Sequence, residues 1–183
     1  MGILSANKAF FMFLGKFVAS YLILTGLYMW YLSPYDTDVS VTDPVTHMVA
    51  GQARDVVHIF GQESHIEQHP REASDKFYVN GQSVSRIVEG CNAVSVMILF
   101  TAFIVAFSTS FKKTSLYIIA GVAIIYVLNI LRIALITTAA YFYPQYSVFI
   151  HDVFFPLFIY GVVFLLWVVW VTKFYKNEKQ AKA

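Results

Sequence analysis

Four long apolar stretches constrain this chain more than any other feature of its sequence. They run from about Phe11 to Leu32, from Ala93 to Ser110, from about Ser115 to Tyr141 and from about Val148 to Val171. A helix needs about 20 apolar residues to cross a hydrocarbon core of about 30 Å. Because each stretch is close to or above that length, we predict an all-α integral membrane protein, a bundle of about four transmembrane helices.

Composition points to the same class of protein. Hydrophobic residues make up 58% of the chain and charged residues only 13%, whereas soluble domains average about 25% charged residues. The net charge is +2, and no basic patch with interleaved aromatic residues suggests a nucleic-acid partner. The single cysteine, Cys91, excludes an internal disulfide framework, and it also excludes a disulfide generator that works through cysteine pairs.

The first apolar stretch is expected to remain in the protein as an anchor. It is longer than the apolar core of a signal peptide, about 7–15 residues, and no small-residue cleavage site follows it. We therefore predict four segments: an N-terminal anchor (1–32), an extracytoplasmic loop (33–90), a three-helix core in the membrane (91–173) and a cytoplasmic tail (174–183).

The basic residues predict the orientation in the membrane. If the chain crosses four times, eight lysines fall on one side, which the positive-inside rule assigns to the cytoplasm. The segment from 33 to 90 carries nine acidic and four basic residues, which suits the outer side. We expect a cytoplasmic (inner) membrane protein with both termini inside. The eight lysines are Lys8, Lys16, Lys112, Lys113, Lys173, Lys176, Lys179 and Lys182.

The outer loop contains two signals for local structure. Asp43 can cap a helix with Pro44 at its first position, and Gly61 can end it. Apolar residues at helical spacing predict that this helix is amphipathic. Asn80-Gly81 lies between alternating apolar and polar residues and predicts a β-hairpin, whereas the polar stretch before it is expected to be an exposed connection. The apolar residues are Val45, Met48, Val49, Val56 and Phe60.

Three reactive side chains are predicted at one depth, at the outer ends of three helices. Arg132 lies about 26 Å from the start of its helix at 1.5 Å per residue. His151 begins the fourth apolar stretch and Cys91 begins the second. An ionisable residue within a membrane helix is a functional candidate because its burial there is unfavourable by about 2.5–3.5 kcal/mol or more.

A cysteine, a histidine and an arginine together suggest acyl transfer. The thiolate of Cys91 would be the nucleophile, and the free N–H groups at a helix start would favour it. His151 could take the thiol proton and later protonate a leaving amine. Arg132 could donate hydrogen bonds to the developing oxyanion. Asn129, on the same helical face, could orient the guanidinium or hold the substrate backbone.

The residues that carry this set also resemble a known family. "VEGCNAVS", "NILRI" and "FIH", in this order at the ends of consecutive spans, look like the exosortase/archaeosortase family, in the short form seen in Bacteroidetes-like genomes. The resemblance implies that Cys91 is the nucleophile, Arg132 the family's arginine and His151 the third catalytic residue. Family members often carry Ser-Gly after the cysteine and have about eight spans, whereas this chain has Asn92-Ala93 and about four.

The resemblance also implies the substrates and the location of the site. Such membrane transpeptidases act on secreted proteins that end in a short motif, one transmembrane helix and a basic tail. The site would face the periplasm or exterior, the acceptor would be an unidentified amine, and membrane lipid would surround the protein. No cofactor and no metal is expected, although His47, His58, His65 and His69 leave a metal site as a minor alternative.

Several assignments stay open at this stage. Glu89 and Asp152 could each orient His151, or each could simply favour a helix start, and Asn92 could support the site or position the substrate. Two other functions fit the same residues. One is a non-enzymatic membrane scaffold or assembly protein in which the polar side chains tie helix ends together, and the other is a thiol acyltransferase that uses a lipid donor.

Overall fold

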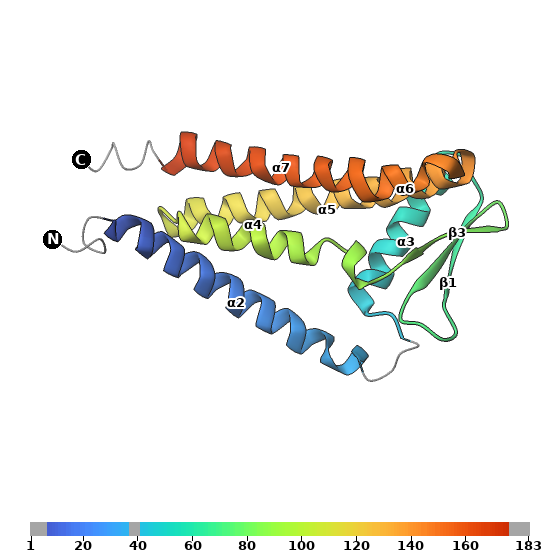
Figure 1. The fold of residues 1–183 in the computed structure, drawn as a ribbon, viewed down its shortest axis with the longest axis horizontal. Coiled ribbons are helices and arrows are strands. Elements are labelled where there is room, and N and C mark those ends of the chain that lie inside the picture. The colour runs from blue at the N-terminus through green and yellow to red at the C-terminus, as the bar shows by residue number, and fades with distance from the viewer. Residues whose placement is uncertain (1–6, 37–40, 176–183) are drawn as a thin grey trace. The chain divides into compact units, whose positions relative to one another are not determined.

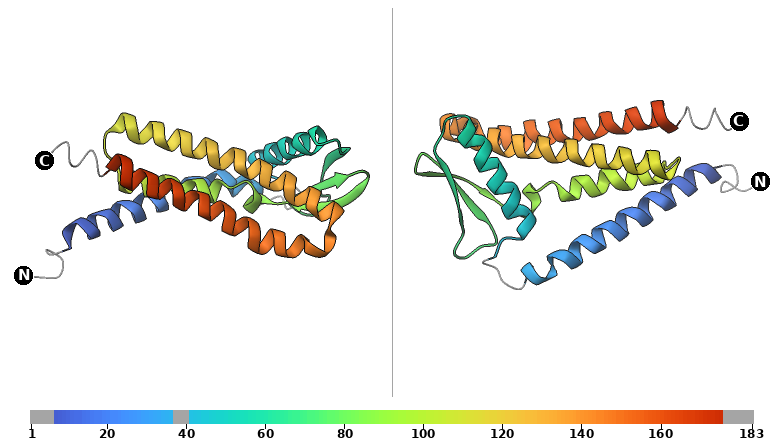
Figure 2. Two further views of the ribbon diagram at one scale, coloured as in Figure 1. Left: turned by 90° about the horizontal axis from the view of Figure 1, so that it is seen from above. Right: turned by 180° about the vertical axis from the view of Figure 1, so that it is seen from behind.

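The structure is a computed structural model that describes residues 7–36 and 41–175. The chain forms two compact units. One consists of Met1–Trp30, Val94–Ile124 and Gly161–Ala183, and the other of Tyr31–Ala93 and Ile125–Tyr160. The ribbon is drawn in Figure 1 and from two further sides in Figure 2. Lys176, Lys179, Lys182 and most of the expected tail at 174–183 lie outside the described residues.

Within residues 7–36 and 41–175, three helical segments are long and apolar enough to cross a membrane, which confirms that the chain is a mostly helical integral membrane protein. They are Phe10–Tyr35 within helix α2 (Lys8–Asp36), Phe111–Phe142, which is helix α5, and Pro144–Tyr175. The last of these combines η2 (Pro144–Tyr146), α6 (Ser147–Phe149), the π-helical turn η3 (Ile150–Phe154), α7 (Phe155–Val169) and the π-helical turn η4 (Trp170–Tyr175).

The expected span from Ala93 to Ser110 is shorter than predicted. Its helix, α4, covers only Val94–Ala106. Thirteen residues at 1.5 Å each extend about 20 Å, less than a hydrocarbon core of about 30 Å. The polar residues after Phe107 explain the early end, because the backbone N–H of Thr109 donates to the Thr114 hydroxyl at 3.2 Å instead of continuing the helix.

Helix α3 (Pro44–Ile59) begins as the sequence indicates. The Asp43 carboxylate accepts hydrogen bonds from the backbone N–H groups of Val45 and Thr46, at 3.1 and 3.0 Å, and Pro44 takes the first position. Gly61, with a φ of 83°, lies just after the helix end. A left-handed glycine there is a common helix terminator, because glycine has no Cβ to clash.

The buried face of α3 differs from the predicted one. Met48 and Phe60, expected on the apolar face, are 48% and 58% exposed. The helix instead turns its small residues inward, which lets it approach its neighbours closely. Its buried residues are Thr46, Val49, Ala50, Ala53 and Val57.

A three-stranded antiparallel sheet follows α3 and adds a small β element to the mostly helical chain. The strands are β1 (Ser64–Gln68), β2 (Asp75–Val79) and β3 (Gln82–Ile87), in the order β1-β2-β3. Strands β2 and β3 flank Asn80-Gly81, whose φ angles of 49° and 79° suit a two-residue hairpin turn. Strand β1 occupies part of the stretch expected to be an exposed connection, because Ile66 packs onto the core and β2 supplies the partner strand.

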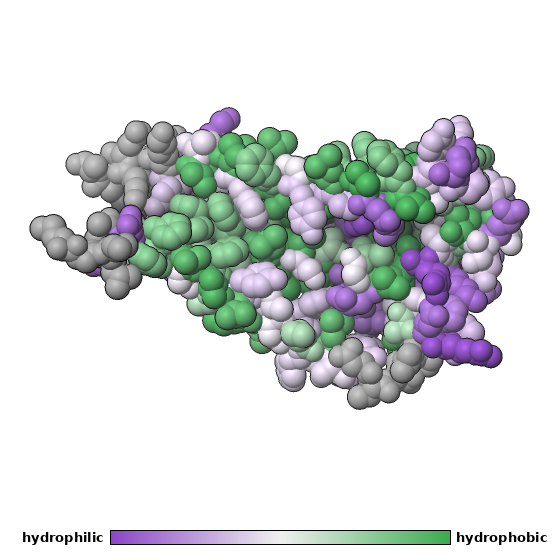
Figure 3. Space-filling model, in the orientation of Figure 1, coloured by the Kyte–Doolittle hydropathy of each residue, from purple (hydrophilic) through white to green (hydrophobic). Residues whose placement is uncertain are grey.

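The core of the second unit holds the C-terminal half of α5 against α3 and the sheet. It combines aliphatic residues of α3 with Phe77 and Val79 of β2, Ile87 of β3, and Ile133 and Ala134 of α5. The surface over the sheet is hydrophilic (Figure 3). This core fixes β3 and α5 relative to each other, and both elements carry residues of the candidate site.

Candidate functional site

Cys91 lies in a short turn, not at the start of α4 as expected. It is the last residue of the 3₁₀ turn η1 (Glu89–Cys91), and its backbone N–H donates to the Val88 carbonyl at 2.8 Å. Asn92 and Ala93 separate it from Val94, where α4 begins. The thiol is free and half-buried. The first turn of α4 therefore does not begin at the thiol.

Ala93 adopts a conformation that normally favours glycine. Its φ is 62° and its side chain is buried. A left-handed backbone costs a non-glycine residue roughly 1–2 kcal/mol. The position is the one at which the resemblance leads us to expect a glycine, so the backbone conformation accounts for that preference, and here alanine adopts it.

One pocket brings together Cys91, Arg132 and His151. The first comes from η1, the second from α5 and the third from η3, and all belong to the same compact unit. The cavity volume is about 40 Å³, room for only a few water molecules. It can therefore receive a single chemical group such as a carbonyl, but not a whole ligand. The remaining lining residues are Ser85, Arg86 and Ile87 of β3, and Ile133, Ile136 and Thr137 of α5.

Asn129 connects the cysteine and the arginine. It is fully buried, and its Nδ2 donates to the backbone carbonyl of Cys91 at 2.8 Å. Its Oδ1 accepts a hydrogen bond from Nη1 of Arg132 at 3.4 Å. One amide thus holds the turn that carries the thiol and also restrains the guanidinium, as expected for a group that orients the arginine.

Arg132 retains hydrogen-bonding capacity that the described residues do not use. Its Nε is buried and has no hydrogen-bond partner in the part of the chain that the structure describes. Arg132 also lines a second, apolar pocket of about 270 Å³ with leucines of α5 and phenylalanines of η3 and α7. A buried donor without a partner is unfavourable by about 1–3 kcal/mol, so a bound carbonyl or oxyanion would stabilise it.

His151 and Asp152 lie next to each other in the π-helical turn η3. Nδ1 of His151 is 2.6 Å from Oδ1 of Asp152, and both side chains are more than half exposed. Pro156 lies one turn later, and its missing N–H removes a regular helical hydrogen bond. A π-turn accommodates such a break and often marks a functional site. Asp152 is therefore placed to fix the imidazole orientation through Nδ1.

Two of the expected supporting residues lie away from this pocket. Asn92 is buried and donates from Nδ2 to the Thr46 hydroxyl of α3 at 3.0 Å, so it anchors the loop after Cys91. Glu89 lines a different pocket, together with Tyr35, Asp43 and Ala73. Of the two carboxylates considered as partners of His151, Asp152 is the one that contacts it.

The sequence reasoning missed the hydroxyl pair that joins β3 to α5. Oγ of Ser85 lies 3.1 Å from Oγ1 of Thr137, and both residues line the pocket. Thr137 follows Arg132 on one helical face, as part of the series 129, 132, 133, 136 and 137, whose spacing is that of one side of a helix. That spacing could have identified Thr137, whereas Ser85 becomes recognisable only once the hairpin is placed.

Comparison with known proteins identifies the family. A family model described as Transmembrane exosortase (Exosortase_EpsH) matches residues 3–171. No curated protein and no solved structure matches the chain. The matched region includes all of the second compact unit, most of the first and every residue of the pocket. The chain therefore belongs to the transmembrane exosortase family.

Proposed function

We propose that this protein is a cysteine transpeptidase of the cytoplasmic (inner) membrane that cleaves the C-terminal sorting signals of secreted proteins. The observation that supports this most strongly is the shared pocket of Cys91, Arg132 and His151, built by three separate elements of one compact unit. Family membership supports a membrane transpeptidase-like activity. The substrate would end in a short motif, a transmembrane helix and a basic tail.

The three side chains have complementary roles in the proposed reaction. The Cys91 sulfur attacks the scissile carbonyl carbon while His151 accepts the thiol proton. Arg132 donates hydrogen bonds to the oxyanion that forms. The C–N bond then breaks, His151 returns the proton to the leaving amine, and the released product carries the signal helix. An amine acceptor or water attacks the thioester that remains, which frees Cys91.

Two neighbouring residues would hold this arrangement in place. Asn129 fixes the Cys91 carbonyl and the Arg132 guanidinium, so that thiol and donor keep their spacing. Asp152 accepts from Nδ1 of His151 and leaves Nε2 for the thiol proton. Positioning of this kind raises rates because the reacting groups need not search for their geometry.

The proposed orientation places the pocket at the outer face, toward the periplasm or exterior. Both termini would be cytoplasmic, with 1–32 as anchor, 33–90 outside, 91–173 as the catalytic part and 174–183 as an inner tail. The polar sheet and α3 would then lie at the outer surface, and lipid would surround the apolar helices.

Three substitutions test the assignment: Cys91→Ser, Arg132→Ala and His151→Ala. The assay uses a reporter, a soluble secreted domain followed by the C-terminal segment of a secreted protein from the same genome. Cys91→Ser should abolish release of the segment, and each of the other two should slow it by at least about 100-fold, the usual effect of losing an oxyanion donor or a general base.

Matched controls separate catalysis from folding. Arg71→Ala and His58→Ala remove an arginine and a histidine that lie outside the pocket, and both variants should release the segment at the wild-type rate. All variants should insert equally and melt at similar temperatures. Wild-type processing by all three pocket variants would exclude the enzymatic function and favour a scaffold.

A further inference from the structure

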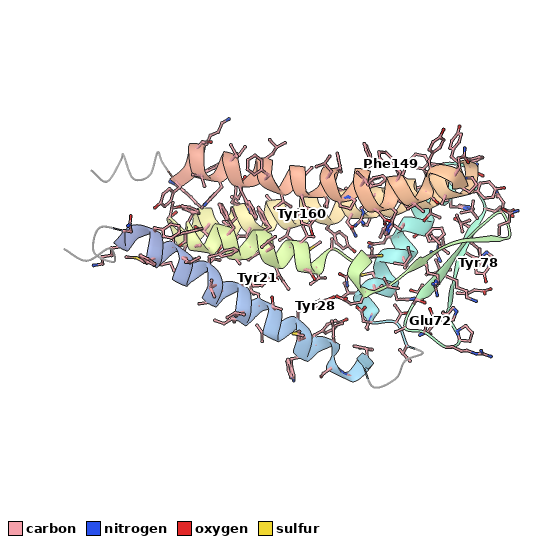
Figure 4. All side chains as sticks on the ribbon, in the orientation of Figure 1. Tyr21, Tyr28, Glu72, Tyr78, Phe149 and Tyr160 are labelled. Atoms are coloured by element: carbon pink, nitrogen blue, oxygen red, sulfur yellow. The ribbon has the colours of Figure 1, made fainter. Side chains whose placement is uncertain are left out.

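Strand β3 is an edge strand that ends beside the candidate nucleophile. In the described part of the sheet it has a strand partner on one side only, β2. Val88 continues the extended backbone, with φ −115° and ψ 169°, and the 3₁₀ turn with Cys91 follows directly. Figure 4 labels Glu72, whose carboxylate accepts a hydrogen bond from Arg86 of this strand. An edge strand presents backbone N–H and C=O groups that another chain can use.

The pocket lies along this edge and not only against one face of the sheet. Three successive residues, Ser85, Arg86 and Ile87, all line it. Neighbouring side chains of a strand point to opposite faces, and the exposures agree: Ile87 is buried in the core whereas Arg86 is exposed. Contact with all three residues supports a space that extends to the rim of the strand.

The usable part of the edge is short. The pairing of β2 with β3 shifts register between Phe77 and Tyr78, which leaves Val84 without a partner in β2. A bulge of this kind bends a strand and interrupts its ladder. The regular stretch on the Cys91 side of the bulge is Ser85 to Val88, long enough to pair with two or three residues.

The chemistry of cleavage calls for such a partner. A peptide bond inside a helix has its carbonyl hydrogen-bonded to the next turn, so a substrate must be extended where a thiolate attacks it. The backbone groups of that extended segment then need new partners, particularly near lipid, where each unsatisfied group is strongly unfavourable. The edge of β3 and the residue after it, Ser85 to Val88, offer backbone hydrogen-bonding groups three to six residues before Cys91.

We propose that the extended segment just before the substrate's membrane helix pairs with the edge of β3, at Ser85 to Val88, through main-chain hydrogen bonds. This added strand presents the scissile carbonyl to Cys91, while the small pocket receives a single group from it. Backbone pairing supplies affinity, and alternate substrate side chains supply specificity. The inference rests on the proposed function, because it assumes that Cys91 attacks this segment.

Disulfide trapping tests the pairing without requiring turnover. Cys91→Ser makes the chain cysteine-free, so Arg86→Cys can be added as a single probe at the exposed edge. The reporter then carries one cysteine at each of six consecutive positions before its membrane helix. A disulfide needs Cα atoms within about 7 Å. Cross-linking should therefore alternate with a period of two along the reporter, with at least a fivefold difference between neighbouring positions.

The matched control is Lys76→Cys in the same background. Lys76 pairs with Arg86 across the β2–β3 ladder, so it lies one strand farther from the edge, and it should not cross-link. Uniform cross-linking along the reporter, or equal cross-linking from position 76, would overturn the inference.

A proline scan of the reporter with the wild-type enzyme supplies a second readout. Proline removes a backbone donor, so release of the segment should fall at least tenfold at alternate positions. Release that is lost in Cys91→Ser but shows no alternation in either experiment would overturn the strand pairing and leave the transpeptidase intact. Alternating cross-links without any release by the wild type would support the strand pairing and overturn the transpeptidase activity.

Discussion

Among its described neighbours, the guanidinium of Arg132 has one N–H group that is hydrogen-bonded and another that is not. Nη1 contacts Asn129, whereas the buried Nε has no partner among the described residues. A lysine at this position keeps the charge but loses the planar fork that can serve Asn129 and an oxyanion together. We expect Arg132→Lys to insert and fold normally and to process the reporter about 100-fold more slowly, measured as kcat/KM. A loss below threefold would show that charge alone suffices.

Ala93 tests whether the turn after the cysteine needs a left-handed residue. A β-branched side chain at a φ of 62° is strongly disfavoured, so Ala93→Val should lower the free energy of unfolding by roughly 1–2 kcal/mol. Ala93→Gly relieves the backbone strain but removes a buried methyl group, so its stability should stay within about 1 kcal/mol of the wild type. Thermal melting in detergent measures both variants. Equal stability of the valine and glycine variants would contradict this account of the turn.

Buried and partly buried hydrogen bonds join the elements of the second unit. Asn129 joins α5 to η1, Asn92 joins the following loop to α3, and Ser85 meets Thr137 between β3 and α5. Each bond contributes only about 1 kcal/mol, but loss of one partner leaves a buried polar group unsatisfied. These hydrogen bonds fix the relative positions of the elements that build the pocket.

Asn129→Asp tests this linkage with little change in shape. The variant cannot donate to the Cys91 carbonyl and places oxygen against oxygen there, so unfolding should require roughly 1–3 kcal/mol less free energy, and processing should fall at least tenfold. Tyr126→Phe is the control, since it removes a hydrogen bond from the same helix to Gln52 of α3 and does not touch Cys91. It should cost similar stability and leave processing near wild type at 20 °C or below. Equal loss of processing in both variants would reduce Asn129 to a stability role.

Sequence patterns predicted some of these elements well and others poorly, for physical reasons. The cap of α3 and the strands beside Asn80-Gly81 follow from local chemistry, so the sequence alone was enough. The buried face of α3 depends on its tertiary neighbours, and periodicity does not show which of its apolar residues, such as Met48 and Phe60, stay exposed. Strand β1 exists because β2 lies beside it. These outcomes need contacts that a linear pattern does not contain.

The candidate site shows the same division. Polar residues in long apolar stretches led to Cys91, Arg132 and His151, and the structure places them around one pocket, while their catalytic roles stay predictions. Sequence reasoning put Cys91 at a helix start, whereas it lies in a 3₁₀ turn. Of the two roles left open for Glu89, the structure agrees with the helix start, because Glu89 lies in the first turn of η1 and lines another pocket. A one-residue change in a turn redirects a side chain completely, and spacing along the chain cannot reveal it.

The whole molecule combines apolar helices that can cross a membrane with a polar sheet and helix that pack on the C-terminal half of α5. The proposed orientation makes a direct prediction, because Cys91 is the only cysteine and is half-buried at an open pocket. A membrane-impermeant maleimide added to intact spheroplasts should label the wild type, with Cys91→Ser as the unlabelled control. Labelling only after the membrane is permeabilised would place the pocket on the cytoplasmic side.

The central claim is that Cys91 forms a covalent bond with the substrate. Wild-type protein is mixed with the reporter, quenched rapidly in acid and analysed by intact-protein and peptide mass spectrometry. We predict an adduct of the reporter's secreted domain on Cys91, linked as a thioester, released by neutral hydroxylamine and absent from Cys91→Ser. Processing that continues in Cys91→Ser, or an acyl adduct on a residue other than Cys91, would contradict the account.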